Sequence, residues 1–205
     1  TELTVNEIAR RINEELVATW GNLVNRVLSM VHGTCGGVVP PVGERARNDT
    51  ALLADVDAAL ERVAAHIDRV ELRAGLRSGM AAAAAVNAYL NATEPWKAAR
   101  DDPERARVIL GTALSAVNGI RVCLSPYLPF SNAALDEILG PVEGWCRTEV
   151  EPGRPIERPS PLFAKVDPTA LDGRYSHTNS ALDPLWKIWV ITQISPGVTS
   201  ISGFV

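Results

Sequence analysis

The feature that most constrains the fold is an apolar stripe that recurs at steps of three and four residues. Residues at these steps share one face of an α-helix, which turns once every ~3.6 residues. The pattern predicts a long first helix from Thr4 to Val31, whose stripe is Val5, Ile8, Ile12, Leu16, Leu23, Val27 and Val31. A helix with one apolar face must pack against other elements to bury it.

The same spacing predicts four more helices: from Thr50 to about Ala74, from Met80 to about Asn91, from Pro103 to about Leu124, and from Asn132 to Leu139. Gly75 and the pair Ser78-Gly79 predict a break between the second and third helices, and Pro95 predicts a turn or a new helix start. The alanine run at 81–85 favours a close helix–helix contact. We therefore expect residues 1–140 to form an all-α bundle with short connections, as antiparallel packing requires.

The pattern changes after Gly140. Residues 141–168 are rich in proline, which favours an extended tether that lies along the surface of the bundle. Residues 169–205 form a divergent tail with isolated aromatic side chains, Tyr175, Trp186 and Trp189. Within the tail, Ile188 to Thr192 has the propensity of a strand.

Charge and cysteine usage exclude several classes of protein. The formal net charge of −4 argues against a non-specific nucleic-acid binder, so we expect no DNA partner, and any RNA contact must use a local patch. The three cysteines, Cys35, Cys123 and Cys146, are far apart and have no metal-ligand spacing. They predict no metal site and a reducing, cytoplasmic setting. No apolar run has the length that we expect of a membrane span.

Three features do not fit simple core patterning. Asn22 and Arg26 are one helical turn apart, and an amide beside a guanidinium suits an unpaired base edge and its phosphate. Trp96 follows a proline, where an indole could stack on an unpaired base. Asn87 and Tyr89 form a polar and aromatic pair on the preceding helix. The alternatives are structural: a solvated helix face for the first pair, a core or helix-staple residue for Trp96, and back-bonding to the helix for Asn87.

Four segments of the chain resemble one known family. The segments 15–26, 87–97, 124–129 and 161–166 are similar, in order and spacing, to signatures of the anticodon-binding domain of methionyl-tRNA synthetases. The resemblance covers roughly Val5 to Asp167. It implies the helical bundle of class Ia synthetase anticodon-binding domains, with an irregular C-terminal extension.

The resemblance also implies a function. In this family the CAU anticodon of methionine tRNA is read by an asparagine and an arginine on the first helix, and a tryptophan stacks on a base. Those roles fall on Asn22, Arg26 and Trp96, with a supporting role for Asn87 and Tyr89.

The family's catalytic motifs are missing from this sequence. The histidines, His32, His66 and His177, are not in a His-x-Gly-His setting, and there is no KMSKS loop. We therefore expect this chain to be inactive by itself and to hold no cofactor, since ATP and methionine would bind the missing catalytic domain. The alternative is a truncated synthetase paralogue in one of two other roles. It could be a protein-interaction module that uses the tail at 169–205, with a separate catalytic domain or another protein as partner, or a tRNA-dependent accessory protein.

Overall fold

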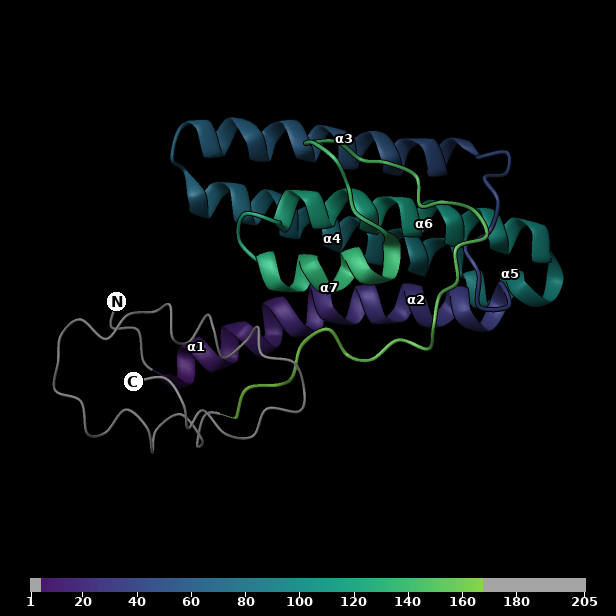
Figure 1. Ribbon diagram of the computed structural model, residues 1–205, viewed down its shortest axis with the longest axis horizontal. Coiled ribbons are helices and arrows are strands. Elements are labelled where there is room, and N and C mark those ends of the chain that lie inside the picture. The colour runs from purple at the N-terminus through teal and green to yellow at the C-terminus, as the bar shows by residue number, and fades with distance from the viewer. Residues whose placement is uncertain (1–4, 168–205) are drawn as a thin grey trace, which may run out of the picture.

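The computed structural model describes residues 5–167, and these residues form a bundle of helices (Figure 1). In chain order the elements are α1 (Val5–Arg11), η1 (Ile12–Gly21), α2 (Asn22–Thr34), α3 (Arg47–Asp68), α4 (Leu72–Thr93), α5 (Pro95–Asp101), α6 (Pro103–Leu124) and α7 (Pro129–Leu139). The predicted all-α class is confirmed.

The first predicted helix is one continuous rod that changes its winding. The chain enters as α1, passes through η1, a π-helix of 10 residues, and continues as α2. The backbone N–H of Asn22 donates to the carbonyl of Val17, five residues back, which is the π-helical pattern. The sequence did not predict this π-helix, because the apolar stripe was matched to the three- and four-residue spacing of an α-helix. The rod ends at Thr34 rather than Val31, and its predicted first residue, Thr4, lies outside the described residues.

The boundary between the second and third predicted helices was wrong. α3 ends at Asp68, and Val70, which falls within the helix predicted from Thr50 to about Ala74, has a φ of 58° and is 78% exposed. α4 begins at Leu72, so Gly75 and Gly79 lie inside a helix and do not break it. A Cβ on Gly79 would lie 2.8 Å from Cδ2 of Leu124, so this glycine permits α4 to approach α6 closely.

The close contact predicted for the alanine run is confirmed on one face. Ala82 and Ala83 are buried in the core, whereas Ala81 and Ala84 are exposed. Small side chains at this point let α4 pack near its neighbours α3 and α6.

The central helix is α6, in which every residue from Thr112 to Leu124 is buried. It contacts α2, α3, α4, α5 and α7. In the described part of the chain it is the one helix long and apolar enough to cross a membrane, although the sequence led us to expect no such run. The bundle covers 83% of that apolar window, so the apolarity is that of a core helix.

The last helix begins earlier than predicted. α7 starts at Pro129, with Leu128 at its N-cap, so Ser131, which precedes the predicted helix, lies within the first turn. The Ser131 hydroxyl donates to the carbonyl of Leu128 at 3.0 Å.

Residues 140–167 run back over the bundle without regular structure, but they are more than a tether because Val150, Ile156 and Phe163 are buried. Ile156 N–H donates to the carbonyl of Gly37 at 2.7 Å, which ties this segment to the α2–α3 connection. A Cβ on Gly21 would lie 2.9 Å from Cδ2 of Phe163, so that glycine makes room for the ring. The predicted tail at 169–205, including its strand, lies outside the described residues.

Candidate functional site

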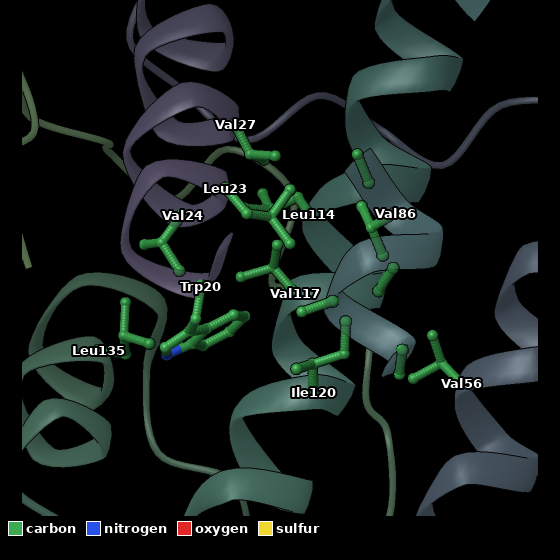
Figure 2. Close-up of a cluster of buried hydrophobic side chains, with 14 of the residues drawn as sticks. Trp20, Leu23, Val24, Val27, Val56, Val86, Leu114, Val117, Ile120 and Leu135 are labelled. Carbon is green, nitrogen blue, oxygen red and sulfur yellow. The ribbon is translucent and has the colours of Figure 1, made fainter. Parts of the chain in front are cut away.

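The two predicted residues of the first helix lie on α2, directly after the π-helix. Leu23 and Val27 point into the core (Figure 2), Val31 is buried as well, and together they fix the orientation of the helix. The opposite side of the same turns therefore faces outward, and it carries Asn22, which is exposed, and Arg26, which is half-buried.

Trp96 lies on α5, at the end of the bundle where α4 turns sharply (Figure 1). Glu94 is the residue between the two helices, and its left-handed backbone, with a φ of 44°, makes the turn possible. Pro95 occupies the first turn of α5 and is buried, which confirms a helix start at this proline. The Trp96 side chain is left 41% exposed.

The structure brings Arg26 and Trp96 together. The guanidinium carbon of Arg26 lies 5.0 Å from the centre of the indole ring, within the range of a cation–π contact. Arg26 Nη2 also donates to Oδ1 of Asn91 on α4 at 3.0 Å. Three helices, α2, α4 and α5, thus meet at one patch that offers a cation, an aromatic ring and amide groups. These groups suit unpaired bases and their phosphates.

Asn87 braces the helix that carries Asn22. Its Nδ2 lies 3.4 Å from the carbonyl of Thr19 on η1 and 3.3 Å from the carbonyl of Ala83 on its own helix. The amide therefore links α4 to the last turn of the π-helix and donates back to its own helix as well. Asn87 thus supports the rod that carries Asn22 and Arg26.

Tyr89 is not at the patch, because it is buried and faces α3. Its hydroxyl donates to Oδ1 of Asp49 at 2.7 Å, and Arg105 donates to both oxygens of the same carboxylate, one of them at 2.8 Å. Burial raises the pKa of Tyr89, and donation to Asp49 raises it further, so the hydroxyl stays protonated. Tyr89 holds α4 to α3 and α6.

Sequence reasoning missed Asn91 and the Asp49 cluster. Asn91 lies within the segment 87–97, which carried the resemblance, and it is one helical turn after Asn87. This spacing was the available indication that the two asparagines share one face of the helix. Its contact with Arg26 spans 65 residues of sequence, so no local pattern could show it. Asp49 was hidden because a carboxylate in the first turn of a helix usually only complements the helix dipole.

The sequence matches one family model, described as the anticodon binding domain of methionyl tRNA ligase, over residues 39–178. Asn87, Tyr89 and Trp96 lie within the matched residues, and Asn22 and Arg26 precede them. The methionine–tRNA ligase of Roseiflexus castenholzii is 38% identical over 192 residues, which cover 78% of this chain and 32% of that protein. The methionine–tRNA ligase of Corynebacterium jeikeium is 35% identical over 213 residues, covering 82% of this chain and 35% of that protein.

Solved structures agree with the sequence comparison. The apo crystal structure of Mycobacterium tuberculosis methionyl-tRNA synthetase superposes with a TM-score of 0.74 and 29% identity, over 80% of this chain and 35% of that one. The same enzyme bound to methionyl-adenylate gives a TM-score of 0.71 and 30% identity, over 78% of this chain and 33% of that one. This chain thus spans about a third of the length of the relatives that it matches. It belongs to the family of methionyl-tRNA ligase anticodon-binding domains.

Proposed function

We propose that this domain recognises the CAU anticodon of methionine tRNA, with Asn22 and Arg26 on base edges and phosphate and Trp96 stacked on an unpaired base. The observation that carries the proposal is the contact between Arg26 and Trp96, at 5.0 Å from guanidinium carbon to ring centre. Arg26 covers part of the indole, and a base can stack on the part that stays exposed. Since the net charge is −4, base contacts must supply more of the selectivity than a general phosphate field.

We propose that this domain contributes anticodon recognition and no catalytic step. The relatives named as methionine–tRNA ligases are about three times as long as the stretch they share with this chain. We infer that activation of methionine and its transfer to tRNA require polypeptide that corresponds to the remaining two thirds, and that ATP and methionine bind there.

Replacing Trp96 with alanine is expected to weaken binding of the CAU anticodon stem-loop by about tenfold to hundredfold. Stacking of a base on an aromatic side chain contributes about 1–3 kcal/mol, and ~1.4 kcal/mol corresponds to tenfold in the dissociation constant. The measurement is a fluorescence-anisotropy titration of labelled stem-loop at one stated salt concentration, because phosphate contacts make RNA affinity salt-dependent. A second stem-loop with its cytosine changed reports selectivity.

The matched control is Phe130→Ala on α7, an aromatic side chain that is 52% exposed. It should leave the dissociation constant unchanged. If Trp96→Ala bound the CAU loop as tightly as the wild type, the assigned site would be wrong. If the wild type bound neither stem-loop, the helical scaffold would have another use, and the protein-interaction role would gain support.

A further inference from the structure

We propose that Asn91 is a positioning residue, which holds the Arg26 guanidinium against Trp96 before RNA binds. The inference rests on the proposed function and adds a residue that the anticodon-reading roles do not include. Its geometric basis is the bond from Arg26 Nη2 to Asn91 Oδ1 at 3.0 Å, made by the same guanidinium that lies over the indole. A residue from α4 thereby fixes a side chain from α2 over a ring from α5.

The corner between α4 and α5 keeps the acceptor and the ring in fixed relation. Glu94 N–H donates to the carbonyl of Leu90 at 3.0 Å, which is the last turn of α4. The carbonyl of Glu94 accepts from Lys97 N–H at 2.8 Å, which is the first turn of α5, so the backbone of Glu94 is bonded to both helices. The Lys97 ammonium adds an ion pair to the Glu94 carboxylate at 2.8 Å. Asn91 and Trp96 lie on either side of this corner, and together they hold the Arg26 guanidinium in the free protein.

The partner of Arg26 differs in charge from the partners of other arginines in the bundle. Arg105, Arg121 and Arg147 pair with aspartates, which neutralise them. Arg26 bonds to a neutral amide, and within residues 5–167 the structure records no ion pair for it. The amide therefore fixes the side chain and leaves its positive charge available to an anionic ligand.

Holding Arg26 in place favours binding for an entropic reason. A free arginine loses rotamer freedom when it is immobilised on a ligand, and this loss weakens affinity. An arginine that is already held in the free protein loses little further rotamer freedom when the ligand binds, so its binding is less weakened. Asn91 itself is exposed, so its role does not depend on packing in the core.

A double-mutant cycle on CAU stem-loop binding tests the proposal. Asn91→Ala is expected to raise the dissociation constant about fivefold to tenfold in the wild-type background, and to change nothing when Arg26 is already alanine. An unchanged dissociation constant in the wild-type background, or an equal loss in both backgrounds, would overturn the proposal, since Asn91 would then not act through Arg26. The control is Asn6→Ala, an exposed asparagine on α1, and thermal melts of all variants verify folding.

A second readout needs no RNA. In two-dimensional NMR spectra of the free protein, the indole N–H peak of Trp96 is expected to move in Asn91→Ala, because the guanidinium leaves the ring. Trp96→Phe identifies the peak, and Asn6→Ala should leave it in place. A peak that stays put in Asn91→Ala would overturn the positioning role. Failure of the wild type to bind the CAU loop selectively would overturn the proposed function, and the indole peak would then decide the positioning role separately.

Discussion

Replacing Trp20 with alanine is expected to lower the free energy of unfolding by about 3–5 kcal/mol, the usual cost of truncating a large aromatic side chain in a core. The indole is only 1% exposed. Figure 2 shows it with Leu135 of α7 on one side and Val117 and Ile120 of α6 on the other. Removing it leaves a cavity between the first helix and two of its neighbours, and the lining side chains can relax only in part.

Such a loss is a large share of the total for a domain of this size, since folded proteins are stable by about 5–15 kcal/mol. Urea unfolding followed by far-ultraviolet circular dichroism measures it. Trp145→Ala is the matched control, because Trp145 is 38% exposed and is held by a bond from Nε1 to the carbonyl of Leu60 at 2.9 Å. Its loss should cost about 1 kcal/mol. Equal midpoints for the two variants would contradict the central position assigned to Trp20.

Replacing Asp49 with alanine is expected to cost about 3 kcal/mol. The carboxylate is fully buried and accepts hydrogen bonds from Arg105, from the hydroxyl of Tyr89 and from the backbone N–H of Ala46 at the start of α3. Removing one partner of a buried pair costs about 3–5 kcal/mol. We expect the lower end because Arg105 is 28% exposed and can turn toward water, whereas Tyr89 cannot.

The contribution of Asp49 should depend on pH in a defined direction. Burial opposes ionisation of this carboxyl, but the bonds from Arg105, Tyr89 and Ala46 outweigh burial and hold its pKa below the ordinary value. A group whose pKa is lower in the folded state stabilises at neutral pH, and its contribution is lost as pH falls below about 4. Asp49→Asn should therefore lower the free energy of unfolding at pH 7 and flatten its decline below pH 4.

Asp57→Ala serves as the control for this cluster. Asp57 also pairs with an arginine, Arg147, at 2.9 Å, but its carboxylate is 48% exposed. Water screens and replaces such a pair, so its loss should cost about 0–1 kcal/mol. If the variants at Asp49 and Asp57 unfolded at the same urea concentration, the buried cluster would not hold α3, α4 and α6 together as described.

The sequence predicted the helices well where apolar periodicity alone determines them. It mispredicted helix boundaries where contacts between residues distant in sequence determine the structure. Val70 falls within the second predicted helix and yet lies in an exposed turn, because the chain must reverse between α3 and α4. Gly79 had the signature of a break, but the approach of Leu124 from α6 explains why a helix needs glycine there. Neither contact is visible in a window of neighbouring residues.

The candidate site divides in the same way. The spacing of Asn22 and Arg26 placed both on one exposed face, which a single helix suffices to predict. The meeting of Arg26 with Trp96 depends on the sharp corner at Glu94, whose left-handed backbone is uncommon for a residue with a side chain. Only the resemblance to a known family connected the two segments from sequence, and it assigned no role to Asn91.

The π-helix η1 has a consequence for the direction in which the side of α2 with Asn22 and Arg26 faces. In η1 each hydrogen bond spans five residues, against four in α1 and α2, so the same rise along the axis takes up additional chain. One residue corresponds to about 100° of rotation in an α-helix. If the ten residues of η1 were rewound as α-helix without any deletion, each turn would take fewer residues, and α1 and α2 would rotate relative to each other about the helix axis. The number of residues in η1, as well as their identity, therefore sets the azimuth of Asn22 and Arg26 with respect to the start of the helix.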